Sequence, residues 1–369
     1  MKYAGRLAAV AVVGALSLAA CGTDNNASSS TTGASASAPA AAGNDNGLSG
    51  TINAAGSSAQ ANAITEWTKN FAATNPGVTL NYQPSGSGAG VQAFIQGTVS
   101  FAGSDSALKE DEPAQADARC KTGKAINIPM VTGPVAVVYN LPGVEGLQLS
   151  PKTLSGIFNS TITKWDDAAI KADNPEAKLP SSPIQAFHRS DESGTSDNFT
   201  KFLKATGGWP HEPAKAWPAE AKGQGSKGSD GIASSVKDTE GAISYVEFSY
   251  AENSSLQKAK VANGAGEFVE LTPESAAKTV ETAEVKGTGN DLALSIDYAT
   301  KTAGAYPIVL VTYEITCEKG LPAEESKIVK SFLTYTASDE GQAALKDLGY
   351  APLSGALLTK VRSAVEAIS

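Results

Sequence analysis

The 369-residue sequence contains only two histidines and three cysteines, and its basic residues do not cluster. His188 and His211 are isolated and show no spacing typical of zinc ligands, so the sequence does not predict a metal site. Lys and Arg number 29 against 38 Asp and Glu, which gives a formal net charge of −9. Without a basic cluster, nucleic-acid binding is disfavoured. The composition therefore argues against two common functional classes.

The first 20 residues have the features of a bacterial secretory signal. Lys2 and Arg6 precede an apolar run over residues 7–18 that is too short to span a membrane. The run ends in Leu-Ala-Ala before Cys21, which is similar to the lipobox of bacterial lipoproteins. We therefore expect removal of residues 1–20 and a lipid anchor on Cys21, outside the cytoplasmic membrane. The remaining 27 basic and 38 acidic residues give a formal charge near −11.

Residues 21–49 consist mostly of Gly, Ser, Thr, Ala, Asn and Asp, with almost nothing to bury. This composition predicts a flexible linker. The chain from about Gly50 is long enough to form a core and to divide into two lobes. If Cys21 is lipidated, Cys120 and Cys317 remain as an even pair in an oxidising compartment. We expect a disulfide between them, and two buried free thiols are the alternative.

The chain after residue 50 alternates predicted strands, glycine-rich turns and predicted helices. This alternation indicates an α/β protein that binds its ligand at the carboxyl ends of the strands. A long β-rich segment over 126–139 is broken at Gly133-Pro134, and a second strong strand is predicted over 306–314. Segments of this kind can carry the chain from one lobe to another and back. Residues 253–300 are polar and give no clear assignment.

An arginine and a helix start follow one another after the strand predicted at 184–187. Ser193 fits the N-cap position of a helix whose apolar face includes Phe199, Phe202 and Leu203. A helix N-terminus offers unpaired N–H groups and a partial positive charge, and the Arg189 guanidinium suits a tetrahedral oxyanion. The segment indicates an oxyanion site, and the alternative is a well-capped helix beside a surface arginine.

Two more glycine- and serine-rich loops are predicted to begin helices. One is Gly-Ser-Ser-Ala at 56–59 and the other is Gly-Ser-Gly-Ala-Gly at 86–90. Either loop alone is a weak signal, because most such loops are turns or N-caps. Together with the loop at 193–195, they favour convergence on one small anion.

Seven segments of the chain match a known family. They are GSSAQANAI at 56–64, YQPSGSGAGV at 82–91, FAGSD at 101–105, TKWDD at 163–167, RSDESGTS at 189–196, GSKGSDGI at 225–232 and GAISYVEFSYA at 241–251. Through them, most of residues 50–369 resembles PstS, the family of phosphate-binding proteins of bacterial ABC phosphate importers.

The resemblance implies an α/β fold of the type II periplasmic-binding-protein class, a clam shell of two α/β lobes joined by two crossover strands. Lobe I would comprise residues 50–134 and 305–369, and lobe II residues 135–304. Both Cys120 and Cys317 then fall in lobe I, which agrees with the expected disulfide. The implied protein is a monomer without a cofactor or catalytic activity. Its expected partners are inorganic phosphate and the membrane permease subunits of an ABC importer.

The resemblance also implies a set of phosphate contacts. These would be Ser58, the Ala59 N–H, Ser87, Asp105, Arg189, Ser193, the Gly194 N–H and Thr195, with Asp191 holding Arg189 from behind. Asp105 would accept the proton that phosphate carries and sulfate lacks, whereas without the other motifs it would be interpreted as a turn or N-cap aspartate. The family often has an aromatic residue at the position of Ala59 and glycine at that of Glu192, so the effect of these two departures is open.

Three other functions remain as alternatives. A different oxyanion, such as arsenate, sulfate or molybdate, could be the ligand, although Asp105 argues against fully deprotonated anions. A hydrolase would use Ser193, His188 and Asp191, but these lie within six residues, which rarely gives triad geometry. A surface lipoprotein could also have kept the fold and lost the ligand.

Overall fold

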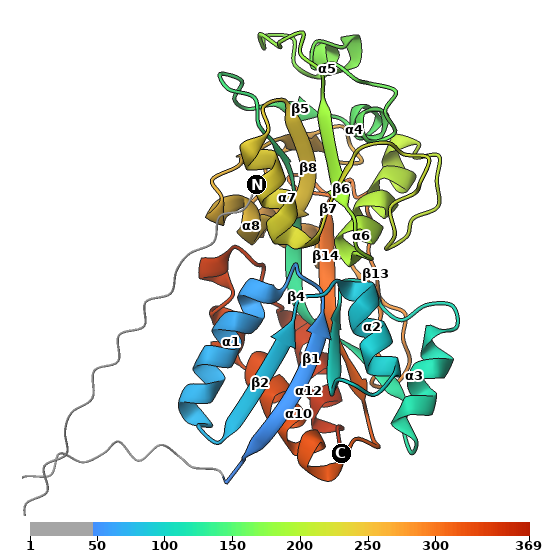
Figure 1. Cartoon of the computed structure of the whole chain (residues 1–369), viewed down its shortest axis with the longest axis vertical. Helices are drawn as coiled ribbons and strands as arrows, with labels where there is room; N and C mark the ends of the chain where they lie inside the picture. Colours follow the sequence, from blue (N-terminus) through green and yellow to red (C-terminus); the bar gives the residue numbers. More distant parts are fainter. Residues whose placement is uncertain (1–46) are drawn as a thin grey trace, which may run out of the picture. The chain divides into compact units, whose positions relative to one another are not determined.

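The computed structural model describes residues 47–369, so the expected signal peptide, the lipidation site Cys21 and most of the linker lie outside the described residues. A nine-stranded sheet runs through this part of the chain in the order β2-β1-β3-β14-β4-β8-β6-β7, and β9 also pairs with β4 (Figure 1). Its strands are β1 (Gly50–Gly56), β2 (Val78–Gln83), β3 (Phe101–Ser104), β4 (Ala125–Tyr139), β6 (Gln185–Arg189), β7 (Gln224–Ser226), β8 (Ala242–Glu247), β9 (Gln257–Lys258) and β14 (Val309–Cys317).

The remaining strands are short and form two small sheets. One has the order β11-β10-β5, and the other is the pair β12-β13. Much of this structure lies within the polar segment that the sequence left unassigned. The strands are β5 (Gln148–Leu149), β10 (Lys260–Ala262), β11 (Phe268–Val269), β12 (Glu284–Val285) and β13 (Leu294–Ser295).

Strands β4 and β14 connect two lobes (Figure 1). The first part of β4 pairs antiparallel with β14 as far as Pro134, and from Val135 onward β4 pairs with β8. The predicted break at Gly133-Pro134 does not interrupt the strand, and it falls where β4 changes its partner from β14 to β8. The second predicted strand is displaced, since β14 begins and ends three residues later than expected. The expected architecture of two α/β lobes joined by two crossover strands is confirmed.

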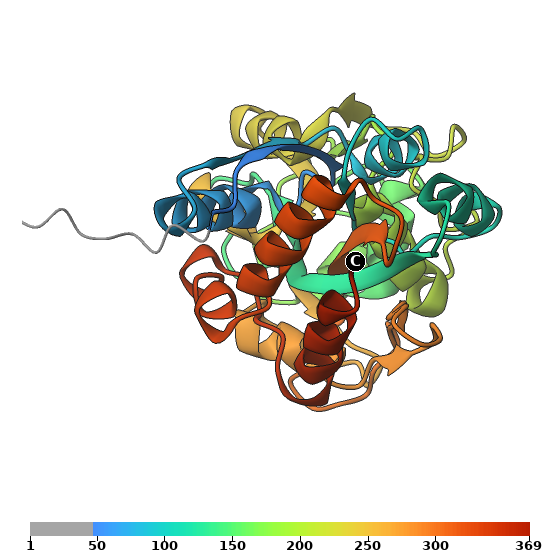
Figure 2. The same cartoon turned by 90° about the horizontal axis from the view of Figure 1, so that it is seen from below.

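Lobe I contains β1, β2 and β3, and its helices pack on both faces of these strands. Seen from below in Figure 2, the orange-red helix α10 lies over the blue strand β1, with α12 beside it. Phe332 packs against Phe71 and Phe101, with ring centroids 5.4 and 6.0 Å apart. The helical elements are α1 (Ala61–Thr74), α2 (Ser87–Ile95), α3 (Glu112–Cys120), α10 (Ala323–Thr336), α11 (Asp339–Ala343), η2 (Lys346–Leu348) and α12 (Gly355–Glu366).

Lobe II contains β6, β7 and β8 and has its own aromatic core. Phe199 on α6 stacks on Tyr245 of β8 with ring centroids 4.3 Å apart, and Phe158 meets both rings edge-on. This core fixes the start of α6 relative to the end of β6. The helical elements between β4 and β14 in the chain are α4 (Pro151–Phe158), α5 (Ala168–Asp173), α6 (Gly194–Phe202), η1 (Leu203–Gly207), α7 (Gly228–Asp238), α8 (Phe248–Asn253) and α9 (Pro273–Val280).

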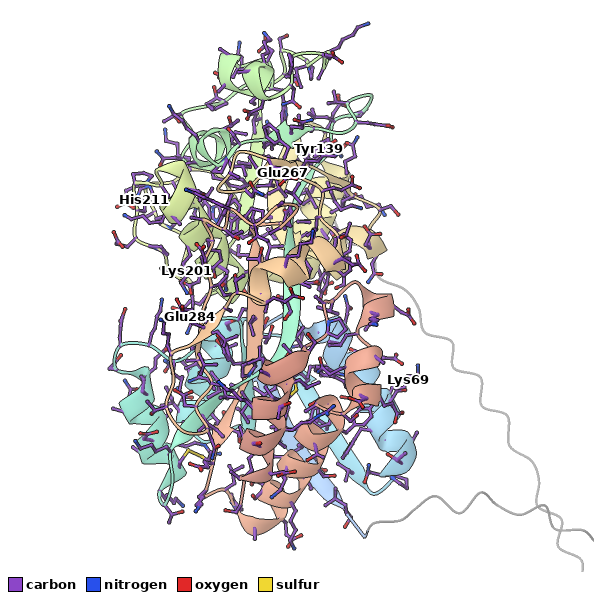
Figure 3. The ribbon with its side chains drawn as sticks, turned by 180° about the vertical axis from the view of Figure 1, so that it is seen from behind. Lys69, Tyr139, Lys201, His211, Glu267 and Glu284 are labelled. Atoms are coloured by element: carbon purple, nitrogen blue, oxygen red, sulfur yellow. A yellow bond between two sulfur atoms is a disulfide. The ribbon has the colours of Figure 1, made fainter. Side chains whose placement is uncertain are left out.

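The expected disulfide between Cys120 and Cys317 is confirmed (Figure 3). It joins the end of α3 to the end of β14, and both residues are fully buried. None of the helices in residues 47–369 combines the length and apolar character that a membrane span requires.

Removing this disulfide should destabilise the fold without changing it. The bond closes a loop with a sequence separation of 197 residues, so its loss increases the entropy of the unfolded chain. We expect the variant C120A/C317A to lose about 2–4 kcal/mol of unfolding free energy. Urea unfolding with and without reductant measures this loss. Reductant should destabilise the wild type and leave the variant unchanged; equal unfolding curves for the two oxidised proteins would contradict the prediction.

Candidate functional site

The first glycine- and serine-rich loop connects β1 to α1. Gly56 has a φ of 142°, and a Cβ there would lie 1.9 Å from the Gly103 carbonyl oxygen, so only glycine fits. The Ser57 N–H donates to the same carbonyl at 2.8 Å, which fixes the loop to the end of β3. The Ala59 N–H, expected to face a ligand, donates to Ser57 Oγ at 3.0 Å.

Ser58 from this loop contacts lobe II. Its hydroxyl lies 3.0 Å from Ser229 Oγ and accepts the Ser229 N–H at 3.1 Å. Its carbonyl oxygen accepts the Tyr250 hydroxyl at 2.8 Å. Ser229 is in the first turn of α7, so a fourth helix start faces the site from lobe II. Ser229 and Tyr250 lie in two of the segments that carry the family resemblance, but neither was predicted as a site residue.

The second loop places Ser87 at the start of α2. Ser87 Oγ accepts the backbone N–H groups of Asp105 and Gly194, each at 3.2 Å. Because these two donors occupy its lone pairs, its own hydrogen points to Asp105 Oδ2 at 3.3 Å. Ser87 therefore connects both lobes at a single oxygen atom.

Asp105 follows β3, and its side chain is almost completely buried. Thr312 of β14 donates to its Oδ1 at 2.8 Å, and Thr195 of α6 lies within 3.5 Å of its Oδ2. Burial raises the pKa of Asp105, and the hydrogen bonds from Ser57 and Thr312 and the charge of Arg189 offset only part of this effect. A carboxylate with a raised pKa is a better proton acceptor.

Thr312 was not predicted as a site residue, although the strand gave a signal. Thr312, Glu314 and Thr316 alternate with Tyr313 and Ile315 in an otherwise apolar strand. Side chains two residues apart point to the same face of a strand. A polar face on a buried strand could have identified β14 as part of the site.

Arg189 ends β6 and is held by Asp191. Its Nε donates to Asp191 Oδ1 at 2.7 Å and its Nη2 to Oδ2 at 2.5 Å, a two-bond geometry that fixes the guanidinium plane. Asp191 also accepts the Gly228 N–H at 3.1 Å. Burial acts to raise the pKa of Asp191, but these bonds and the charge of Arg189 outweigh it, so the pKa lies below its usual value.

The start of α6 matches its prediction from the sequence. Ser193 is the N-cap, and its hydroxyl accepts the Ser196 N–H at 3.3 Å. A Cβ on Gly194 would lie 2.5 Å from Asp105 Cβ, so glycine allows this helix start to approach lobe I. The structure thus brings Ser87, Gly194 and Thr195 to Asp105. Of the other predicted residues, Ser58 contacts Ser229 of lobe II and Arg189 pairs with Asp191.

The proposed hydrolase residues have other contacts. His188 Nδ1 is hydrogen bonded to the Arg189 carbonyl oxygen at 3.0 Å, and its ring stacks on Trp217. The hydroxyl of Ser193 caps α6, and Asp191 binds Arg189. In the described residues, no group of His, Cys, Asp and Glu side chains could hold a metal ion.

A cavity lies beside Asp105. Its volume is about 430 Å³, and its lining includes Asn198 and the three lysines Lys109, Lys201 and Lys286. The buried Asp197 pairs with two of them, Lys201 at 2.7 Å and Lys109 at 3.5 Å. Figure 3 shows Lys201 from behind. Lys286 pairs with Glu284, so the three lysines are matched by the carboxyl groups of Asp197, Glu284 and Asp105.

Two further carboxyl groups are buried near Asp105. Burial raises the pKa of Glu247 and of Glu314 to about 8 each, and the charge of Asp105 adds to both increases. The candidate site therefore combines one guanidinium, several hydroxyl and N–H donors, and a buried acidic centre.

Comparisons with known proteins agree with this arrangement. A family model described as a PBP superfamily domain matches residues 29–340. The phosphate-binding protein PstS 3 of Mycobacterium tuberculosis (strain ATCC 25618 / H37Rv) is 42% identical over 99% of this chain and 98% of its own. The corresponding PstS 2 is 38% identical over the full length of both chains. PstS of Xylella fastidiosa is 32% identical over 81% of this chain and 80% of its own.

Solved structures show the same fold at lower identity. The periplasmic phosphate-binding protein PfluDING, bound with phosphate, aligns with a TM-score of 0.69 and 24% identity over 85% of this chain and 93% of its own. A phosphate-binding protein from Stenotrophomonas maltophilia aligns with a TM-score of 0.66 and 20% identity over 85% and 94%. These neighbours are type II periplasmic binding proteins, which confirms the expected fold class.

Replacing Asp191 with asparagine should destabilise the protein in a pH-dependent way. The change leaves the buried Arg189 charge without its carboxylate, which costs about 3 kcal/mol. Because the folded-state pKa of Asp191 is lowered, its contribution is present above the usual pKa and disappears as pH falls through the lowered value. Urea unfolding of the wild type and D191N near neutral and at acidic pH measures the difference. An equal difference at both pH values would contradict this expectation.

Proposed function

The chain belongs to the PstS family of phosphate-binding proteins, and we propose that it binds inorganic phosphate with high affinity outside the cytoplasm and delivers it to the permease of an ABC importer. One observation carries the proposal: the starts of α2 and α6, one from each lobe, meet at the buried Asp105, and the charge of Arg189 acts on the same carboxyl group. The phosphate contacts are Ser58, Ala59, Ser87, Asp105, Arg189, Ser193, Gly194 and Thr195, with Asp191 orienting the guanidinium.

Asp105 distinguishes phosphate from sulfate. Phosphate near neutral pH retains a proton that a carboxylate can accept, whereas sulfate would place its lone pairs against the charge of Asp105. Leaving such a buried group unsatisfied costs about 1–3 kcal/mol or more. Sites that bind a hydrogen-bonding group in this way can reject an analogue without it by about 10⁴-fold.

Hydrogen bonds between the lobes support a site that opens and closes. Ser87 with Gly194 and Asp105 with Thr195 are linked at 3.2 and 3.5 Å, at or beyond the long end of normal hydrogen bonds. These donors can exchange their present partners for phosphate oxygens at little cost. Phosphate would then favour the closed arrangement because it bonds to both lobes at once.

The lobe boundaries proposed from the sequence follow the change of strand partner. Lobe I comprises residues 50–134 and 305–369, and lobe II comprises residues 135–304. Support comes from β4, which exchanges β14 for β8 between Pro134 and Val135. In this division, phosphate contacts come from both lobes.

Arsenate is the alternative ligand that this site discriminates least, since it has the same shape and also carries a proton. Sulfate and molybdate are disfavoured by Asp105. A hydrolase is disfavoured because His188 and Ser193 use their polar atoms elsewhere. We therefore assign no catalytic role to the site.

The cellular arrangement is the last part of the proposal. Residues 1–20 act as a signal peptide, Cys21 carries the lipid, and residues 21–49 tether the monomeric binding protein near the permease. The composition of the first 49 residues supports this arrangement.

Calorimetry with phosphate and sulfate tests the binding function. The purified, dialysed full-length protein should bind phosphate tightly and give no heat with sulfate. Replacing Asp105 with asparagine should weaken phosphate binding about tenfold or more and reduce the discrimination, because an amide can donate to either anion.

The exposed aspartate Asp347 provides the matched control, since D347N makes the same chemical change at a position outside the proposed phosphate contacts. It should behave as the wild type does. Unchanged selectivity in D105N would remove Asp105 from its proposed role, and no phosphate heat in the wild type would reject the function itself.

Membrane fractionation tests the anchor. In a bacterial host, the C21A variant should move from the membrane to the soluble extracytoplasmic fraction and should lose labelling by a fatty acid. The variant C120A/C317A serves as the control and should keep both membrane association and the label. A C21A protein that stays on the membrane would contradict a lipid at this position.

A further inference from the structure

Three polar side chains gather beneath the first phosphate loop, over Gly103 of β3. A Cβ on Gly103 would lie 2.0 Å from Gln60 Nε2 and 2.6 Å from the Tyr82 hydroxyl oxygen. Glu314 of β14 is the direct partner of Gly103 in the sheet. Gln60 and Glu314 are both fully buried. The absence of a side chain on Gly103 provides the space for this cluster.

The direction of the hydrogen bonds in this cluster follows from Tyr82. Its hydroxyl donates to the Ser57 carbonyl oxygen at 2.7 Å. Because a tyrosine has one hydroxyl hydrogen, its oxygen then accepts Gln60 Nε2 at 3.0 Å. The amide of Gln60 is thereby oriented, with Nε2 toward Tyr82 and Oε1 available as an acceptor.

Among the described residues, the cluster leaves three buried oxygen atoms without a hydrogen-bond partner: Gln60 Oε1 and both carboxyl oxygens of Glu314. A buried carboxylate and a buried carbonyl oxygen are both acceptors, so neither can satisfy the other. A single proton on Glu314 changes this, because a carboxylic acid can donate to Gln60 Oε1. These unpaired acceptors therefore indicate that Glu314 is protonated and neutral.

The electrostatic surroundings agree with a neutral acid. Burial raises the pKa of Glu314 to about 8, the charge of Asp105 adds to the increase, and the Gln60 amide acts against it. The cluster also contains the titratable Tyr82, whose pKa is raised by burial, by Glu314 and by the neighbouring Asp105 and Tyr250. On the partner strand β4, Glu314 lies opposite the apolar Ile128.

We propose that Glu314 is a positioning residue of the phosphate site, which as a neutral acid donates to Gln60 and completes a relay through Tyr82 to the Ser57 carbonyl. The relay holds the loop that carries Ser57 and Ser58. This role rests on the proposed function, because it deepens the assignment of the same site.

Loss of the proton reverses the relay. An ionised Glu314 accepts Gln60 Nε2, so the amide turns and presents Oε1 to Tyr82. The Tyr82 hydroxyl then donates to Gln60 and releases the Ser57 carbonyl oxygen. A second negative charge also develops beside Asp105. Both effects weaken phosphate binding at alkaline pH.

Thermal unfolding against pH tests the protonation of Glu314 without any ligand. Since the folded-state pKa is raised, the stability that Glu314 contributes is present at acidic pH and is lost as pH rises toward about 8. In the variant E314Q, the side chain at position 314 is an amide that does not titrate. The difference in Tm, E314Q minus wild type, should therefore increase between about pH 5 and pH 8 and then level off. A difference that stays constant over this range would overturn the proposal.

Phosphate calorimetry over the same variants tests the relay. The ratio of wild-type to E314Q affinity cancels the titration of phosphate. It should lie near one at about pH 6.5 and fall about tenfold by about pH 9.5. E314L and Y82F, which lack one donor of the relay, should bind about tenfold more weakly than E314Q at about pH 6.5.

E324Q is the matched control, because Glu324 is an exposed glutamate in an ion pair with Lys327 on α10. Its affinity and its Tm should follow the wild type at every pH. A ratio of wild-type to E314Q affinity that does not change with pH, while the wild type binds phosphate normally, would overturn the role of Glu314 alone. Absence of phosphate binding by the wild type would instead reject the proposed function, and this role with it.

Discussion

A buried carboxylate, Asp105, imposes the main constraint on this structure. Its direct hydrogen-bond partners in the described residues include the hydroxyls of Ser87, Thr195 and Thr312, which come from three different elements. A buried charge is tolerated only when such donors surround it. The position of Asp105 therefore requires α2 and α6 to begin beside it and β14 to pass it. Helix α2 belongs to lobe I, α6 belongs to lobe II, and β14 is a crossover strand.

Glycine makes this convergence possible at two places. At Gly56 the chain passes within contact distance of the Gly103 carbonyl, and at Gly194 the start of α6 approaches Asp105. In each case a Cβ would overlap atoms of the neighbouring strand or loop. These close approaches require glycine, and glycine is also common in ordinary turns. The loops therefore look like ordinary turns in the sequence.

The sequence predicted those features that depend on a local residue pattern or on the even number of cysteines left after lipidation. The Ser193 N-cap follows from residue types at fixed spacing, and the pairing of Cys120 with Cys317 follows from the count of cysteines in an exported chain. The family resemblance supplied the lobes, which periodicity alone did not distinguish.

Contacts between distant segments were not predictable in the same way. Thr312 reaches Asp105 across 207 positions, and Ser229 reaches Ser58 across 171. The polar face of β14 marks Thr312 but not its partner, which depends on the register of the sheet. Ser229 meets Ser58 only because the start of α7 faces the first loop. The predicted break does not interrupt β4 for a related reason: Pro134 lacks an N–H, but the adjoining strands accommodate it where β4 changes partner.

The position of the disulfide has a consequence for the integrity of the protein outside the cell. Cys120 and Cys317 bracket all of lobe II, including the polar segment that carries only short strands. A protease that cuts the backbone once anywhere between them leaves two fragments that remain covalently joined through sulfur. Both crossover strands then stay attached to the same lobe, so a nicked molecule keeps every group that surrounds Asp105.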